Sequence, residues 1–148
     1  MRKTVVTVLA AGLLVGSLGA TANAGKKTVT KNFTLLAPVA APILTDVDPN
    51  GCLNTEEDVS KDTYAFKAPK HKKSGTLSVR IDGFEGDWDL FVLKGDTVLA
   101  ESTSDNLSQD FEAVTVGRIK GGTKLNIVGC NWSGSPQAEG SLAYKYKK

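Results

Sequence analysis

The sequence has 148 residues, with 18 basic and 16 acidic side chains, one histidine and two cysteines. The length suits a single domain. One histidine gives no ligand spacing typical of a zinc site. The near balance of opposite charges gives no electrostatic case for binding nucleic acid or an anionic membrane. The composition therefore favours a single-domain protein outside the zinc-dependent and nucleic-acid-binding classes.

Residues 1–24 have the pattern of a secretory signal peptide. Two basic residues precede an apolar run at 5–18, and residues 22–24 are a small-x-small cleavage site. The run is too short for a comfortable membrane span, although a retained anchor is the alternative. Cleavage after Ala24 would leave one domain, 25–148, in which 16 basic side chains balance 16 acidic ones. The sequence therefore predicts a secreted, extracellular protein without a membrane span.

Alternation of apolar and polar residues predicts β-strands along the whole mature chain. In the first segment Val29, Phe33 and Leu35 share one parity, with Lys31 as a misfit. Pro38 argues against a helix after it. Further strands are expected at 63–68, 77–82, 86–93, 98–100, 111–116, 125–130 and 142–146. The prediction is an all-β protein, an antiparallel β-sandwich of jelly-roll or Greek-key type with about eight strands.

The apolar parity of these strands identifies the expected core, and the polar segments between them identify the expected loops. The basic turn 69–75 is expected to expose His71 to solvent, without the partner and the shielding that a catalytic base needs. The segment 131–137, rich in Asn, Ser and Gly, is expected to be a loop. The predicted core consists of Leu77, Val79, Ile81, Leu90, Val92, Val114, Val116, Ile127 and Leu142.

Two carboxylates flank Trp88 at the start of the expected strand 86–93. Asp87 and Asp89 point the same way, because side chains alternate along a strand. The four apolar residues that follow them without a break indicate a strand covered on both faces, with Trp88 in the core. The two carboxylates are expected to accept backbone N–H donors. The alternatives are metal ligands, or the acid pair of an exported hydrolase.

The spelling Gly-Asp-x-Asp-Leu-aromatic-Val at 86–92 resembles the pre-peptidase C-terminal domain, a bacterial secreted β-sandwich module. The resemblance covers about 63–146. Glu112 ahead of an apolar strand also looks like the family, whereas Phe91 stands where the family usually has tyrosine. Such modules usually form the C-terminal domain of secreted peptidases and other exported hydrolases, whereas no catalytic domain precedes the module in this sequence. The resemblance implies a stand-alone accessory module.

A second motif precedes the expected strand 63–68. Asp46, Asp48, Asn50 and Glu57 have the spacing of a calcium-binding loop, with Gly51 at the sharp bend. A hard cation prefers such closely spaced oxygens, so calcium is the possible cofactor. Prolines and strand alternation flank the motif in place of helices. The alternative is an Asx-turn loop whose carboxylates accept backbone N–H bonds.

The two cysteines, Cys52 and Cys130, are expected to form a disulfide, because an exported chain matures in an oxidising compartment. The bridge would close a long loop and stabilise the fold by on the order of 4 kcal/mol. Two free thiols are the alternative.

Trp132 lies two residues after Cys130 in the sequence. It either stacks on a ligand from an exposed loop or packs over the Cys130 bridge.

These features lead to three functional hypotheses. The first is a secreted, non-catalytic binding or accessory module for an extracellular protein or polysaccharide, with no assembled catalytic residue set. The second is an exported hydrolase that uses Asp87 and Asp89. The third is a module that binds or inhibits a secreted protease.

Overall fold

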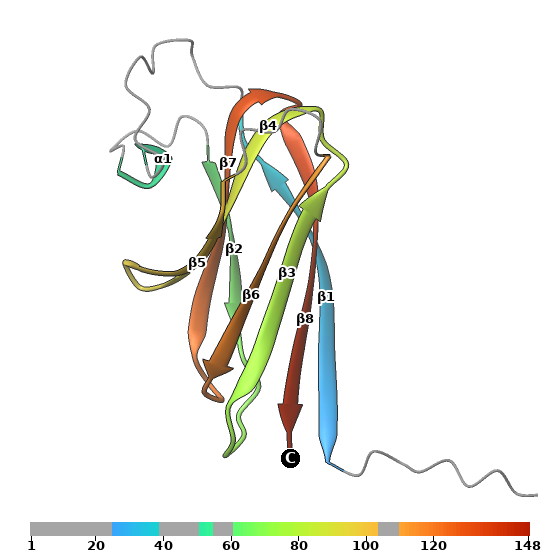
Figure 1. The fold of residues 1–148 in the computed structure, drawn as a ribbon, viewed down its shortest axis with the longest axis vertical. Helices are drawn as coiled ribbons and strands as arrows, with labels where there is room; N and C mark the ends of the chain where they lie inside the picture. Colours follow the sequence, from blue (N-terminus) through green and yellow to red (C-terminus); the bar gives the residue numbers. More distant parts are fainter. Residues whose placement is uncertain (1–24, 39–50, 55–60, 104–109) are drawn as a thin grey trace, which may run out of the picture.

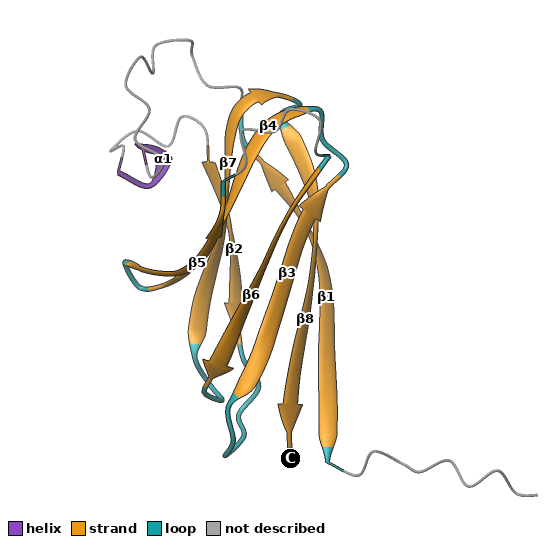
Figure 2. Cartoon of the chain, viewed as in Figure 1, coloured by secondary structure: helices purple, strands orange, loops and turns teal. Residues whose placement is uncertain are grey.

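Two antiparallel sheets packed face to face make up most of the chain that the computed structural model describes, residues 25–38, 51–54, 61–103 and 110–148 (Figure 1). The calcium-loop residues Asp46, Asp48, Asn50 and Glu57 lie outside these residues, as does the predicted signal peptide. Figure 2 shows how completely strands dominate the described part. The elements are β1 (Lys26–Leu36), α1 (Gly51–Asn54), β2 (Lys61–Lys67), β3 (Gly75–Asp82), β4 (Gly86–Lys94), β5 (Thr97–Ser102), β6 (Phe111–Ile119), β7 (Lys124–Gly134) and β8 (Gln137–Lys147).

The strand order identifies the topology. The first sheet has the order β1-β8-β3-β6 and the second sheet the order β2-β7-β4-β5. This is the order of a jelly roll, in which two Greek keys wrap around one core. The predicted all-β sandwich is confirmed. Among the described residues, no helix has the length and apolar character needed to cross a bilayer.

The core lies between the two sheets and follows the period-two alternation of the sequence. All nine predicted core residues are buried there, and Leu77, Ile81, Leu90, Val92 and Ile127 have exposed fractions of 0%. Trp88 is also part of this cluster, as predicted, and its indole Nε1 donates to the Ser135 carbonyl oxygen over 3.1 Å. The alternation therefore predicted the inner face of most strands correctly.

Strand β4 is buried on both faces. Residues 88–92 are buried without interruption. Every second side chain enters the core, whereas Phe91 points to the outer face, where it packs with the Cys52–Cys130 disulfide and Val128. The predicted disulfide and the predicted two-sided burial of this strand are both confirmed. The bridge brings α1, which carries Cys52, onto the outer face of the second sheet.

Strand β7 continues past Cys130 to Gly134, so the prediction of a loop at 131–137 is wrong except at 135–136, which connect β7 to β8. The extension pairs with the start of β4: Asp87 lies opposite Ser133 and Trp88 opposite Asn131, with a β-bulge between the two pairs. The sequence signal failed because the Asn, Ser and Gly residues lie in a strand that pairs with β4 across a bulge, where glycine is also found. Gly86 and Gly134 face each other here with φ of 103° and 96°, and a Cβ on either would collide with the opposite backbone.

His71 is half-buried, so its expected exposure in a solvated turn is wrong. Its ring stacks on Tyr146 with centroids 4.4 Å apart and lies 2.7 Å from the Tyr144 hydroxyl through Nε2. Because the Tyr144 hydroxyl donates to the Ile119 carbonyl oxygen over 2.9 Å, it accepts its second bond from His71 Nε2–H. Burial raises the pKa of Tyr144. The histidine therefore fastens the turn between β2 and β3 to the end of β8.

The two-sided burial of β4 gives a stability prediction. Leu90→Ala removes a side chain with an exposed fraction of 0% and should lower the free energy of unfolding by about 2–5 kcal/mol. Leu99→Ala, at a position on β5 that is 36% exposed, is the matched control and should cost far less. Urea unfolding of both variants measures the difference. Equal losses would contradict the assignment of Leu90 to the core.

Candidate binding face

The carboxylate pair at the start of β4 is tied into the structure. Asp89 is 6% exposed, and the indole Nε1 of Trp132 donates to its Oδ2 over 2.6 Å. Asp89 lies opposite Cys130 in the register, and Trp132 is the extra residue of the bulge that follows. At this position the Trp132 ring reaches the Asp89 carboxylate. Asp87 is half-buried and lies opposite Ser133. Asp89 thus orients an aromatic side chain and is shielded from solvent.

Trp132 is also part of the apolar cover on the outer face of the second sheet. The buried members of this outer cluster are Cys52, Phe91, Val128 and Cys130, with Leu53, Leu93 and Trp132 packed around them. The bridge joins residues 78 positions apart in the sequence. Lys61 Nζ donates to the Cys52 carbonyl oxygen over 3.3 Å and fixes α1 a second time. Trp132 packs against the cluster around the bridge, as one of the two sequence alternatives expects, and ligand stacking by its half-buried ring stays a prediction.

Beside the outer cluster lies a hollow of about 590 Å³. Its lining comes from the four strands of the second sheet, from the turn between β4 and β5, and from α1. It mixes apolar and charged groups, and none of the described residues around it is a histidine, serine or cysteine. The hollow is lined by Leu53, Lys61, Thr63, Leu93, Gly95, Asp96, Val98, Glu101, Asn126 and Val128.

Strand β5 forms one edge of the hollow and one edge of the second sheet. It pairs with β4 on one side and has no further strand beyond it in that sheet among the described residues. Val98 and Leu99 on this edge strand are 37% and 36% exposed. Exposed apolar side chains on a sheet edge promote pairing with another chain. The hollow therefore borders a strand edge that can accept a partner.

A buried glutamate on the first sheet is hydrogen-bonded to the last residue of β5 on the second sheet. Glu112, on β6, is 3% exposed and accepts a hydrogen bond from the Ser102 hydroxyl at the end of β5. Burial raises the pKa of the Glu112 carboxyl; the Ser102 bond acts in the opposite direction, and the charge of Asp87 adds to the rise. Sequence reasoning noted Glu112 only as a family feature. The missed signal is that it shares the inward parity of Val114 and Val116.

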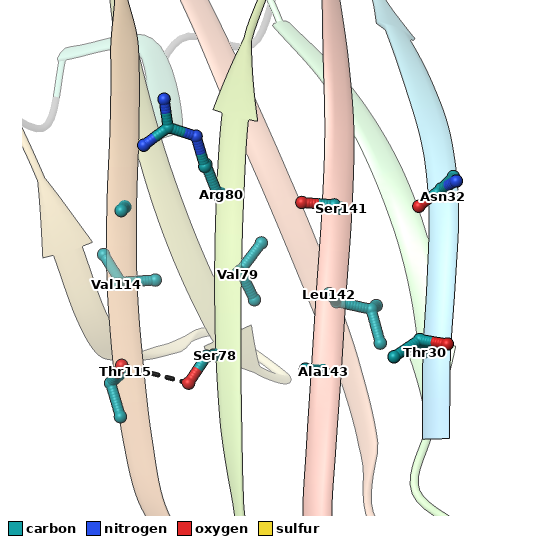
Figure 3. A pocket seen from close by; sticks show the side chains of 11 residues that line it. Thr30, Asn32, Ser78, Val79, Arg80, Val114, Thr115, Ser141, Leu142 and Ala143 are labelled. Atoms are coloured by element: carbon teal, nitrogen blue, oxygen red, sulfur yellow. Dashed lines mark hydrogen bonds between the residues drawn. The ribbon is translucent and has the colours of Figure 1, made fainter. Parts of the chain in front are cut away.

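The outer face of the first sheet has a different character. It carries a hollow of about 420 Å³ whose lining includes small polar side chains. Figure 3 shows these side chains, among them Thr30, Asn32 and Ser141. The Arg80 guanidinium lies 3.8 Å from the centroid of the Phe111 ring and bonds Asp82. The one charged side chain of this hollow is therefore already engaged.

Of the metal ligands that the sequence suggests, only Asp87 and Asp89 lie within the residues that the structure describes. Within the described segments, no group of three or more His, Cys, Asp or Glu side chains is arranged to hold a metal ion, and this includes Asp87 and Asp89. The candidate calcium ligands Asp46, Asp48, Asn50 and Glu57 lie outside these segments. Gly51, at the bend of that motif, is the first residue of α1 and precedes the bridged Cys52 directly.

No protein-family model matches the chain, and no curated protein sequence matches it. Among solved structures it is similar to the periplasmic inhibitor of g-type lysozyme PliG from Aeromonas hydrophila, with 15% identity over 85% of this chain and 89% of that chain and a TM-score of 0.37. A cyclase from Fischerella sp. TAU has 19% identity, coverages of 62% and 59%, and a TM-score of 0.37. Dimeric latent PorU from Porphyromonas gingivalis has 12% identity, coverages of 88% and 14%, and a TM-score of 0.33. Similarity at this level carries no argument about function.

The buried glutamate gives a pH prediction. Because the pKa of Glu112 is raised in the folded state, its stabilising contribution is complete below the pKa of the unfolded chain and is lost as the pH rises through the pKa of the folded state. Glu112→Gln cannot ionise and still offers an oxygen to Ser102. We expect this variant to have a higher free energy of unfolding than the wild type at neutral pH, with a difference that shrinks as the pH falls.

Urea unfolding of the wild type and Glu112→Gln over a series of pH values measures this effect. Glu85→Gln, which neutralises an exposed carboxylate, controls for the loss of one negative charge. A Glu112→Gln protein that is less stable than the wild type at neutral pH would show that the ionised carboxylate stabilises the fold, contrary to the prediction.

Proposed function

We propose that the protein is a secreted, non-catalytic β-sandwich module that binds an extended segment of another exported protein on the outer face of its second sheet. The observation that carries the proposal is the hollow beside the edge strand β5. It combines the apolar side chains Leu93 and Val98 with Lys61, Asp96 and Glu101 along its sides. Apolar contact area among a few charged groups is typical of protein recognition sites.

The edge of β5 explains why an extended segment is the proposed ligand. A peptide that adds a strand to a sheet edge gains backbone hydrogen bonds, and its alternate side chains enter pockets on the sheet face. Here the hollow lies directly on the face next to β5, and Val98 belongs to both features. A polysaccharide is a weaker candidate, because none of the described residues that line the hollow has an aromatic ring to stack on a sugar.

The state of the carboxylates supports a non-catalytic role. A general acid or base must reach the substrate, whereas Asp89 is buried and bonded to Trp132, and Glu112 is buried and bonded to Ser102. The motif at the start of β4 supports a relationship to pre-peptidase C-terminal domains, which accompany exported hydrolases. The disulfide is typical of proteins that mature outside the cytoplasm.

The proposed binding face can be tested with two matched charge insertions. We expect Val98→Glu to abolish the capture of the partner from culture medium by the immobilised protein, because the charge enters the rim of the hollow. Leu36→Glu places the same charge at a 61% exposed apolar position outside the hollow and should leave capture unchanged. Identical retention of partner proteins by all three forms would contradict the assignment of the face.

The non-catalytic assignment has its own control. Glycosidase, peptidase and esterase substrates are incubated with the wild type and with Asp89→Asn, and no turnover is expected from either. Activity of the wild type that disappears in Asp89→Asn would establish the hydrolase alternative and overturn the proposal.

We also propose that calcium stabilises the module through Asp46, Asp48, Asn50 and Glu57. The bridge at Cys52 supports this, since a segment fixed to β7 loses less entropy when an ion orders it. An ion bound only by the folded state raises stability by about 2.7 kcal/mol at a hundredfold excess over its dissociation constant.

The calcium proposal predicts a higher melting temperature in millimolar calcium than in chelator. Asp48→Ala should abolish this gain, and reduction of the disulfide should diminish it. Asp96→Ala, in the turn between β4 and β5, is the matched control and should keep it. A wild-type melting temperature that calcium leaves unchanged would reduce the motif to a hydrogen-bonded turn.

A further inference from the structure

The basic side chains of this protein are concentrated at one end of the sandwich. Four described segments, 25–28, 67–76, 117–124 and 144–148, contribute two, four, three and three Lys or Arg residues, twelve of the 18 in the chain. All twelve are exposed. The same segments contain no Asp or Glu, so all 16 acidic residues lie elsewhere in the sequence. We call these four segments the basic end.

The register of the strands brings the four segments together. Lys26 lies opposite Lys147 at the start of β1 and the end of β8, and Lys67 lies opposite Lys124 between β2 and β7. Gly75, at the start of β3, pairs with both Tyr146 and Ile119. Figure 1 shows the corresponding turns and the C-terminus at the same end of the molecule. Both sheets therefore contribute cations to one surface.

The turn with the highest density of cations is held in place. It carries Lys70, Lys72 and Lys73 around His71, whose ring stacks on Tyr146 and bonds the Tyr144 hydroxyl. Gly121, in the turn between β6 and β7, lies so close to the His71 backbone that a Cβ there would collide with it. Within the described residues, none of the twelve cations forms an ion pair. The charges are thus positioned by the fold and available to an external anion.

We propose that the basic end adsorbs to a bilayer surface that contains anionic phospholipids. The cations surround a blunt end of the sandwich, which suits a planar array of phosphates. The hollows described above lie on the outer sheet faces, away from the four segments of the basic end. Among the described residues, the exposed large apolar side chains Leu36, Val98 and Leu99 lie outside the four segments, so the basic end itself contributes charge and no large exposed apolar side chain to the contact.

The position of Gly25, the first residue after the predicted signal peptide, supports a membrane as the partner. Gly25, which directly follows the predicted signal peptide, lies at the basic end, where its carbonyl oxygen accepts a hydrogen bond from the Lys148 amide over 2.7 Å. A chain whose leader is still in the membrane would therefore present this end to the lipid headgroups. After cleavage, the same charges would keep the module at the surface and leave the hollow on the second sheet open to a partner.

The test is the partition of residues 25–148, which include every described element, onto vesicles of phosphatidylcholine with and without phosphatidylglycerol. We expect binding only to the anionic vesicles and its loss in high salt. Lys72→Gln together with Lys73→Gln should lower the partition coefficient roughly thirtyfold, because each lysine near an anionic surface contributes about fivefold. Lys31→Gln together with Lys94→Gln removes the same charge outside the basic end and should have a much smaller effect.

Three results would overturn the proposal. The first is equal partition onto both kinds of vesicle. The second is an equal loss of binding in the two double variants, which would assign the effect to net charge. The third is binding to soluble polyphosphate without binding to vesicles, which would assign the basic end to a linear polyanion. Melting temperatures of both double variants, measured alongside, establish that each is folded in the assay.

Discussion

The structure depends on the burial of both faces of β4. Its inner face supplies Trp88 and Leu90 to the core between the sheets, and its outer face supplies Phe91 to the cluster around the disulfide. A strand buried on both sides needs a cover over its second face, and here the cover is α1, which the Cys52–Cys130 bridge holds there. A single covalent link thus converts an ordinary solvent-facing sheet surface into a second, smaller core.

This second core shapes the surface around it. Among the described residues, α1 covers only part of the second sheet, and the hollow with its mixed apolar and charged lining lies next to β5. The Trp132 ring and the Asp89 carboxylate are hydrogen-bonded to each other near the bulge, so this carboxylate of the β4 motif contributes to the packing of the face. The proposed ligand site and the basic end lie on different surfaces, so one module can hold a partner while it rests on a membrane.

Most of the fold follows from local patterns in the sequence. The alternation in 77–82 and the uninterrupted apolar run after Asp89 depend on the side-chain period of a strand, which short segments reveal reliably. The errors have a shared physical origin: long-range contacts override local composition. The Asn-Trp-Ser-Gly segment of β7 is a strand because it pairs with β4 across a bulge. His71 is half-buried because Tyr146 arrives from the other end of the chain. Total charge likewise conceals the basic end, since only the strand register reveals which cations gather.

The most direct test of this account is the free energy of unfolding of Phe91→Ala with the disulfide intact. Phe91 has an exposed fraction of 0% on a face that an ordinary sandwich would leave to solvent. A second core held by the bridge predicts a loss of about 3–5 kcal/mol, the cost of truncating a fully buried phenylalanine. A loss within about 0.5 kcal/mol, as at a surface position, would contradict the two-sided burial of β4 and the binding face built on it.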